Sequence, residues 1–246
     1  MLGRCMCSDF YKIKRTPVLW LHVAIPLLGT FAFLGYYHIV PDNHQFSRIS
    51  GFLEVLCIVF PALIGLFCGL MAAQEEQAGG YQFMLTGTKS RATAYLSKLF
   101  LLLLLSAFSI ALAIGVFAIG YTTISIPFYL RATFAIWGGT VFLYVLHLFV
   151  SFRFGRGASI GLGIFGCLIS ALMLTGLGDS IWQWVPWSWN ARFCDNMILA
   201  MQTPSAAALA TANIQTGAII CTAASILSIA ASLLWFRCWN GAKSNE

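Results

Sequence analysis

Long runs of apolar residues, separated by shorter polar intervals, dominate the pattern along this chain. A helix that crosses a bilayer needs about 20 mostly apolar residues, with about 17 as the lower limit. Six runs meet this requirement, at residues 18–37, 52–73, 99–120, 134–150, 159–178 and 217–236. Transmembrane strands would instead alternate over about 10 residues. The pattern therefore predicts an all-α integral membrane protein with six transmembrane helices in a single domain.

The polar interval at residues 74–98 has the pattern of a helical loop. Gly79 and Gly80 are expected to end the preceding helix, because glycine costs about 1 kcal/mol in a helix interior. Tyr81 and Met84 then lie one helical turn apart in a short amphipathic segment. A short helix set crosswise at a membrane surface would provide a binding site for a partner protein. The alternative is a polar loop that only connects two spans.

The charged residues of this interval are expected to be solvated. Glu75 and Glu76 would continue the preceding helix into water, and Lys89 and Arg91 follow the turn. The acidic pair is also found in intramembrane proteases of the CAAX type, but Gly80 stands where such an enzyme would carry an arginine.

Composition and charge support the membrane class and predict an orientation. Hydrophobic residues make up 59% of the 246 residues and charged residues only 9%, whereas soluble domains contain about 25% charged residues. With the N-terminus inside, only Arg48, Arg131 and Arg192 of the 14 lysines and arginines face outward. This positive-inside bias predicts that both termini are cytoplasmic. The net charge of +6 then reflects topology and anionic lipid, and does not indicate a nucleic-acid partner.

Two short segments next to the spans carry candidate surface chemistry. Residues 8–16 mix aromatic and basic side chains, which is typical of a helix lying in the inner interface. Cys5 and Cys7 provide only half of a zinc site, so ordinary reduced cysteines are favoured. Glu54 lies near the outer end of the second run, where it is either functional or able to reach the outer interface.

The outer segment at residues 179–216 begins with a concentration of tryptophan. Four of the eight tryptophans lie within eight residues: Trp182, Trp184, Trp187 and Trp189. Tryptophan prefers the headgroup level of a bilayer, which favours an interfacial anchor. The alternative is a docking surface for an amphipathic ligand at the outer leaflet. The rest of the segment has the composition of an outer-surface helix broken at Pro204.

Motifs for nucleotide hydrolysis and for acyl transfer are not indicated. Residues 87–90, GTKS, have the wrong order for the G-K-[ST] end of a phosphate-binding loop. Residues 157–161, GASIG, match G-x-S-x-G by letter but open a transmembrane run, whereas that motif needs a strand-to-helix elbow. We interpret them as small residues that pack helices, like Gly65 and Gly69 in the second run.

Three stretches together resemble a known family. The loop QEEQAGGYQFMLTGTKSRATAYLSKL, the opening DFYKIKRTPVLWLHVAIPLL and the late VPWSWNARF resemble ABC-2-type transporter permeases. Within that class they are most similar to the lantibiotic-immunity permeases of the MutE/EpiE and MutG/EpiG types. The two paralogous types are not distinguished by these stretches.

The six spans, the interfacial N-terminal helix, the helical loop and the outer segment before the last span also resemble an ABC-2-type permease as an architecture. The resemblance implies a non-catalytic, multi-pass permease subunit in the plasma membrane of a bacterium. A separate ABC ATP-binding subunit would bind ATP and Mg²⁺, and this chain would bind no cofactor itself. A second, non-identical permease subunit would complete the pathway, and the substrate would be a lantibiotic or similar amphipathic peptide expelled to confer immunity. The coupling loop would comprise Glu75, Glu76, Gly79, Gly80, Tyr81, Met84, Lys89 and Arg91. The substrate side would comprise Trp182, Trp184, Trp187, Trp189 and Glu54.

The alternative is a polytopic protein that works without an ATPase: a membrane enzyme, an assembly factor or a secondary carrier. An enzyme or a carrier should place several polar residues at matching depth in facing spans. Only Glu54 and His147 stand out, and they are expected at opposite ends of their helices.

Overall fold

The computed structural model describes residues 2–14, 16–40, 46–86 and 90–241, and within these ranges it contains helices and turns but no strand. Six helical segments are long and apolar enough to cross a membrane. They are α2 (Val18–Ile39), α3 (Ser47–Gln77), α5 (Arg91–Gly120), α6 (Ile126–Phe154), α7 (Arg156–Met173) and α9 (Ala207–Cys238). The prediction of an all-α chain with six spanning helices is confirmed.

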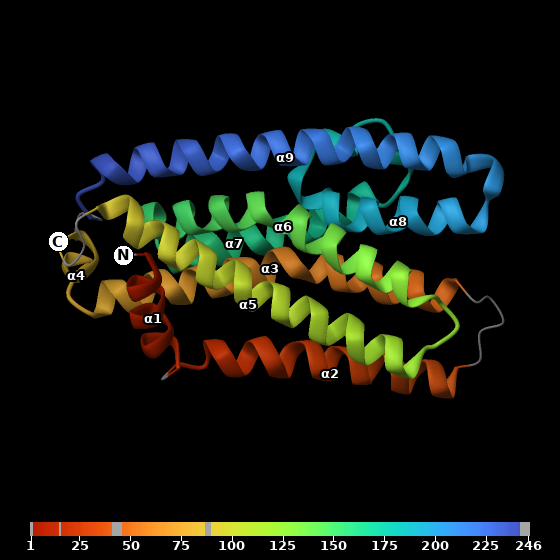
Figure 1. Ribbon diagram of the computed structural model, residues 1–246, viewed down its shortest axis with the longest axis horizontal. Helices are drawn as coiled ribbons and strands as arrows, with labels where there is room; N and C mark the ends of the chain where they lie inside the picture. The colour runs from red at the N-terminus through yellow and green to blue at the C-terminus, as the bar shows by residue number, and fades with distance from the viewer. Residues whose placement is uncertain (1, 15, 41–45, 87–89, 242–246) are drawn as a thin grey trace.

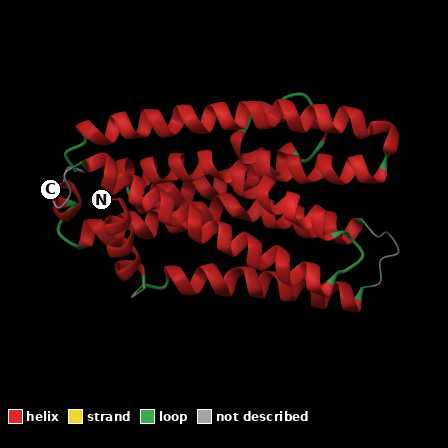
Figure 2. Ribbon diagram, in the orientation of Figure 1, coloured by secondary structure: helices red, strands yellow, loops and turns green. Residues whose placement is uncertain are grey.

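The long helices lie side by side along the longest axis of the molecule (Figures 1 and 2). Both chain termini lie at one end of this bundle, which we call the terminal end (Figure 1). Two short helices also lie there, set across the bundle axis: α1 (Leu2–Ile13) and α4 (Gln82–Thr86). The opposite end, the far end, carries the turn between α5 and α6. Because α2 and α9 form the two edges in Figure 1, they are the least buried of the spanning helices.

Close approach of two backbones holds the centre of the bundle together, where α3 packs most extensively on α7. A methyl group added at Gly65 would lie 2.5 Å from the Ser159 carbonyl oxygen, and one at Gly163 would lie 2.6 Å from the Pro61 carbonyl oxygen. Small residues allow such contacts between membrane helices. The Ser159 hydroxyl donates to the Gly65 carbonyl at 3.1 Å and lies 3.1 Å from Nδ1 of His147. The GASIG stretch therefore packs helices through Ser159, and His147 is part of the same contact.

The helices are longer than the apolar runs that predict them, with one exception. Polar first and last turns extend α3 to Ser47–Gln77, and α5 begins at Arg91 instead of residue 99. The exception is the fifth run, predicted to reach Gly178, whose helix α7 ends at Met173. At about 1.5 Å per residue, the 18 residues of α7 span only about 27 Å, against about 45 Å for its long neighbours.

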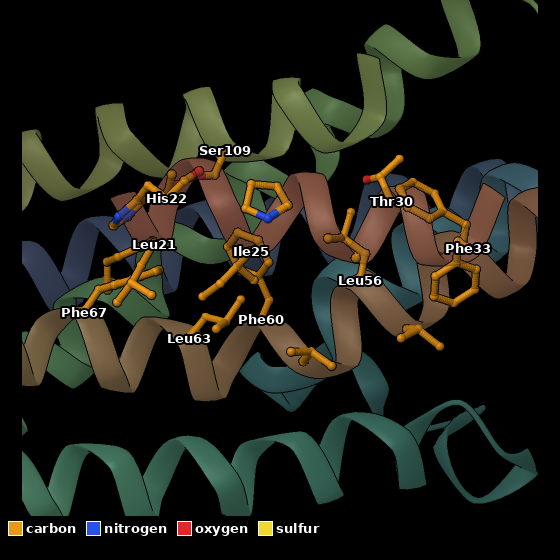
Figure 3. Close-up of a pocket in the computed structure, with 17 residues that line it drawn as sticks. Leu21, His22, Ile25, Thr30, Phe33, Leu56, Phe60, Leu63, Phe67 and Ser109 are labelled. Carbon is orange, nitrogen blue, oxygen red and sulfur yellow. The ribbon is translucent and has the colours of Figure 1, made fainter. Parts of the chain in front are cut away.

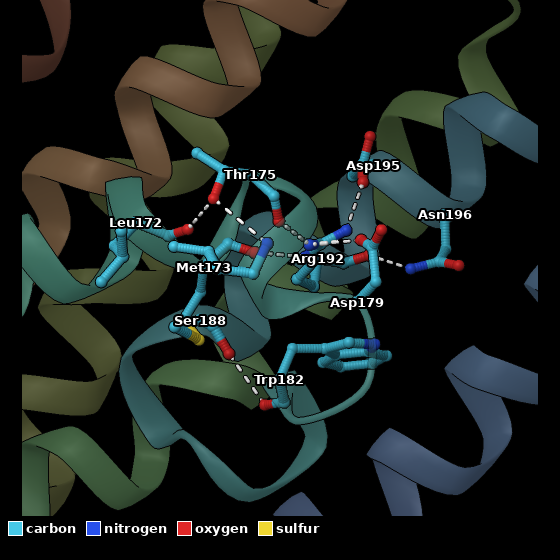
Figure 4. A network of polar contacts seen from close by, with 10 residues as sticks. Leu172, Met173, Thr175, Asp179, Trp182, Ser188, Arg192, Asp195 and Asn196 are labelled. Atoms are coloured by element: carbon cyan, nitrogen blue, oxygen red, sulfur yellow. Dashed lines mark hydrogen bonds and ion pairs between the residues drawn. The ribbon is translucent and has the colours of Figure 1, made fainter.

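The early end of α7 is fixed by Arg192, which is 6% exposed and belongs to α8 (Trp189–Gln202). Its guanidinium donates to the Met173 carbonyl at 2.6 Å and to the Thr175 carbonyl at 2.8 Å (Figure 4). Arginine can satisfy the carbonyl groups that a helix end leaves without partners. It also pairs with Asp179 at 2.8 Å and Asp195 at 3.3 Å.

The first part of the segment at residues 179–216 is buried in the bundle instead of lying on the surface, whereas the predicted break at Pro204 is confirmed. Three short 3₁₀ turns, Gly176–Gly178, Trp182–Trp184 and Pro186–Ser188, reverse the chain, and α8 then lies among α3, α6 and α9. Figure 1 shows α8 alongside the far half of α9. A fourth turn, Pro204–Ala206, separates these two helices. Arg192, which the charge count assigns to the outer side, is buried against the end of α7, and this contact draws the start of the segment into the bundle.

We expect Gly178→Ala to destabilise this turn. An added methyl group would overlap the Met173 carbonyl oxygen and lie 2.8 Å from Nη2 of Arg192. Overpacking of this kind costs about 1–3 kcal/mol, and each kcal/mol lowers the melting temperature of a chain this long by roughly 2–4 °C. Thermal unfolding of the purified chain in detergent measures the change. Gly176→Ala is the control, because its nearest neighbour would be 3.9 Å away; equal melting temperatures for both variants would contradict the geometry.

Candidate functional site

The turn that leads from α3 into α4 is built from three consecutive residues with left-handed backbone conformations. Gly79 has φ 113°, Gly80 has φ 58° and Tyr81 has φ 69°. Glycine adopts such angles freely, but a tyrosine there is uncommon and needs support from its surroundings. The amide groups of Gly80 and Tyr81 donate to the Glu76 and Glu75 carbonyls at 2.7 and 3.1 Å, which closes the end of α3. The turn thereby sets α4 crosswise.

Aromatic packing supplies the support for Tyr81, whose side chain is 3% exposed. Its ring lies 5.8 Å from that of Phe152 at the end of α6 and 5.1 Å from that of Trp239 just beyond α9. Burial, together with the neighbouring Glu76 carboxylate, raises the pKa of Tyr81 to about 12, so the phenol stays neutral at physiological pH. Met84 is also buried, and α4 is therefore fixed to the spanning helices by its inner face.

The other face of the α4 turn is open. Glu76, Gln82 and Thr86 are exposed, whereas Leu85 is half-buried. On the far side of the loop, Arg91 donates to the Trp239 carbonyl at 2.8 Å and to Oδ1 of Asn240 at 2.9 Å. Both ends of the loop are thus fixed to the bundle. Lys89 lies outside the residues that the structure describes.

Glu75 differs sharply from its neighbour Glu76, and its predicted solvation is wrong. Glu75 is 2% exposed, and its Oε1 lies 2.7 Å from Nζ of Lys98 and 2.7 Å from Nζ of Lys12. Lys98 is itself 1% exposed and pairs with Asp9 at 2.9 Å, while the Ser97 hydroxyl donates to the second Asp9 oxygen. We call Asp9, Lys12, Glu75 and Lys98 the charge cluster; it joins α1, α3 and α5.

The helical phase of these residues gives a sequence signal that the interpretation as a solvated loop overlooked. Glu75 lies three and four residues after the buried Ala72 and Met71, so it continues the buried stripe of α3. Lys98 follows the buried Tyr95 on α5 in the same way. A charge on the buried face of a helix requires a partner, because desolvating an unpaired ion is costly.

A second feature, near the middle of the bundle, is an apolar pocket between α2, α3 and α5, with a volume of about 130 Å³ (Figure 3). Aliphatic and aromatic side chains line most of it, among them Ile25, Phe33, Leu56 and Phe60. Its polar members are His22, Thr30, Ser106, Ser109 and Tyr144.

His22 lies at the edge of this pocket, and no sequence pattern singled it out. Its ring stacks on Phe67 at 3.7 Å, and its Nδ1 lies 2.7 Å from the Val18 carbonyl. The Ser109 hydroxyl donates to the His22 carbonyl at 2.7 Å. Because a carbonyl oxygen can only accept, Nδ1 carries the hydrogen.

The four tryptophans do not form one surface. Trp182 and Trp189 are each 1% exposed and belong to the core, with the indole nitrogen of Trp189 bonded to the Gln183 carbonyl at 2.8 Å. Trp187 packs against α7, where a methyl group at Gly166 would overlap its ring. Trp184 alone of the four is strongly exposed, at 73%. Trp182, Trp187 and Trp189 anchor the turn to the bundle, because their rings pack against α9, α7 and α6 respectively.

Glu54 is half-buried and accepts from the Ser50 hydroxyl at 2.6 Å. It lies close enough to Asp195 to interact with it electrostatically, so it borders the Arg192 contacts at the end of α7. No three His, Cys, Asp or Glu side chains gather into a candidate metal site within the part of the chain that the structure describes.

Comparison with known proteins assigns the architecture. A family model described as "ABC-2 family transporter protein" matches residues 7–170, which is more than half of the chain. The matched region includes α2, α3, α4, α5 and α6, and therefore contains both the pocket and the α4 turn. Neither the comparison with curated proteins nor that with solved structures found a match.

We expect Lys98→Met to be strongly destabilising. It would leave Asp9 buried without a cation, and breaking a buried ion pair by removing one partner costs about 3–5 kcal/mol. Lys14→Met is the matched control, because Lys14 is exposed and sits next to α1 without facing the charge cluster. Thermal unfolding in detergent should separate the two variants clearly. Equal stability would mean that the charge cluster does not hold the terminal end together.

Proposed function

The chain belongs to the ABC-2 transporter family, and we propose that it is the permease subunit of an exporter that expels a lantibiotic or a similar cationic, amphipathic peptide from a bacterial plasma membrane. As a member of this family it is a multi-pass membrane transport component. In the proposal a separate ABC subunit binds ATP and Mg²⁺, and a second, non-identical permease subunit completes the pathway.

The observation that carries the proposal is the crosswise α4 at the terminal end. Its inner side is locked into the bundle by Tyr81 and Met84, whereas Gln82 and Thr86 face out. A push on the outer face would therefore be transmitted to α5, on which α4 packs. It would also reach Phe152 of α6 and Trp239, just beyond α9, through the ring of Tyr81. This is what an ATP-driven partner needs, since it must move helices in the membrane from outside it.

The proposed orientation places the terminal end in the cytoplasm. Arg4, Lys12, Lys14, Arg153 and Arg237 all belong to helices or turns at that end. Arg48 and Arg131 lie near the far end, and Arg192 is buried. The excess of accessible positive charge at the terminal end is the pattern that cytoplasmic loops show.

The apolar pocket supports an amphipathic substrate. An engineered cavity of about 150 Å³ lined by aliphatic and aromatic groups binds benzene, and this pocket, at about 130 Å³, is of similar size. It can take one apolar side chain of a peptide rather than the whole molecule. Because α2 is an edge helix that packs mainly on α5, the pocket lies at the side of the bundle where a peptide in the membrane would arrive.

The proposal is tested first by isolating the tagged chain from detergent-solubilised membranes and identifying what accompanies it by mass spectrometry. An ABC ATP-binding subunit and a second polytopic chain are expected. If the chain is isolated without these partners, under conditions that preserve other membrane complexes, the result would favour the alternative of a protein that works without an ATPase.

We expect charge added to the outer face of α4 to uncouple the transporter. Gln82→Arg with Thr86→Arg should weaken association with the ATP-binding subunit about tenfold or more, because disruption at the centre of an interface typically costs over 1 kcal/mol. Both side chains are exposed, so folding should be unchanged. Cys7→Arg adds a similar charge to the exposed face of α1 and serves as the control. Undiminished association and peptide resistance in the double variant would rule out α4 as the contact.

We also expect a side chain placed in the apolar pocket to reduce resistance to the peptide. Gly29 lines the pocket, and a Cβ atom added there would meet nothing within 4 Å, so Gly29→Leu adds apolar volume at the pocket without a clash at its first atom. Gly35 lies on the same helix, has equally open surroundings and does not line the pocket. Growth in the presence of the peptide, corrected for membrane expression, should fall for Gly29→Leu and remain unchanged for Gly35→Leu. If cells with either variant are equally resistant to the peptide, the pocket takes no part in peptide removal.

A further inference from the structure

A second, polar cavity of about 430 Å³ lies at the terminal end between α1, the end of α3, α4 and α5. Half of its lining comes from one face of α1: Arg4, Cys5, Ser8, Asp9 and Lys12. The remainder consists of Glu75, Ala78, Met84, Ala94 and Lys98. The cavity therefore includes all four residues of the charge cluster but extends beyond them along α1.

The charges that this cavity offers to a ligand are positive. Both Asp9 oxygens are engaged, one by Lys98 and one by Ser97, and the Glu75 side chain is only 1% exposed. The Lys12 side chain, in contrast, is 37% exposed, and Arg4 is exposed and has no ion-pair partner among the residues that the structure describes. Asp9 and Glu75 are thus neutralised by Lys98 and Lys12, and Arg4 adds one further positive charge. Arg4 and Lys12 are the cations that remain accessible.

These accessible groups form one row along α1 that borders the cavity. Arg4, Ser8 and Lys12 follow one another at intervals of four residues, so they lie on the same face of α1. A guanidinium, a hydroxyl and an ammonium can all donate to phosphate oxygens, and arginine is suited to bind two of them at once.

The position of α1 indicates where the phosphate comes from. The helix lies across the bundle just before the first spanning helix (Figure 1), and it also exposes Phe10 at 43% and Tyr11 at 70%. A helix with basic and aromatic faces in this place lies in the headgroup region of a bilayer. In that position α1 would place the mouth of the cavity among lipid phosphates.

We propose that Arg4, Ser8 and Lys12 bind the phosphate of an anionic phospholipid in the cavity between α1 and the α3–α4 turn. A bound lipid would also be linked to the charge cluster, because Lys12 contacts Glu75. Occupation of this site would stabilise α1 against the bundle and thereby support the position of α4. The site does not depend on the identity of the transported peptide.

The test is native mass spectrometry of the full-length chain, titrated in detergent with phosphatidylglycerol or with phosphatidylcholine. Arg4→Gln should weaken phosphatidylglycerol binding about fivefold, since one basic residue near an anionic surface contributes about that factor. It leaves the Lys12–Glu75 contact in place, so the fold is preserved. Lys14→Gln removes the same charge next to α1, outside the cavity, and should leave binding unchanged.

Four results would overturn the proposal. Unchanged binding by Arg4→Gln would mean that the cavity holds no lipid phosphate. An equal loss for Lys14→Gln would reduce the effect to diffuse attraction of a basic helix. An equal affinity for phosphatidylcholine would mean that the site does not select an anionic phospholipid. Displacement of phosphatidylglycerol by millimolar inorganic phosphate would assign the site to a soluble anion instead.

Discussion

A charge buried in an apolar bundle must be paired, and two cations that obey this constraint organise the two halves of the molecule. At the terminal end, Lys98 holds Asp9 and Glu75, so α1, α3 and α5 cannot separate without exposing an uncompensated ion to an apolar environment. Further along the bundle, Arg192 draws the end of α7 and the following turn inward by binding two carbonyl groups. The first contact positions α1 and the α4 turn, and the second converts an outer segment into a part of the bundle.

The terminal end differs from the far end of the bundle, and this difference suits a transporter on which a partner acts from one side. The terminal end combines a crosswise helix, an aromatic contact with the ends of α6 and α9, and the charge cluster. The apolar pocket lies between helices that meet this end directly, because α3 and α5 both contribute to the charge cluster and to the pocket lining. A displacement at α4 can therefore reach the pocket through rigid helices, without a chain of loops.

The packing within the membrane region depends on a different physical term. Apolar side chains gain little by leaving lipid for protein, so close van der Waals contact between small residues has to hold the helices. The approach of Gly65 to the Ser159 carbonyl and of Gly163 to the Pro61 carbonyl provides this contact between α3 and α7. The contact between α3 and α7 thus depends on close packing, whereas the terminal end and the end of α7 are held by charged groups.

The amino-acid sequence by itself determined the class, the number of spanning helices and the place of the α4 turn, because these follow from local properties. Apolar run length fixes a span, and Gly79 and Gly80 permit the backbone angles that end α3. The resemblance of the loop to ABC-2-type permeases agreed with the family that the comparisons found. The orientation rests on charge counting and stays a prediction.

Only the tertiary structure decided which polar residues are buried and what they bind. Glu75 and Glu76 are adjacent in the sequence, yet one is enclosed by two lysines and the other is exposed, because consecutive residues lie about 100° apart around a helix. Trp182 and Trp184 diverge in the same way. The partners of Glu75 lie 23 and 63 residues away, and pairing over such distances depends on helix packing, which no local pattern records.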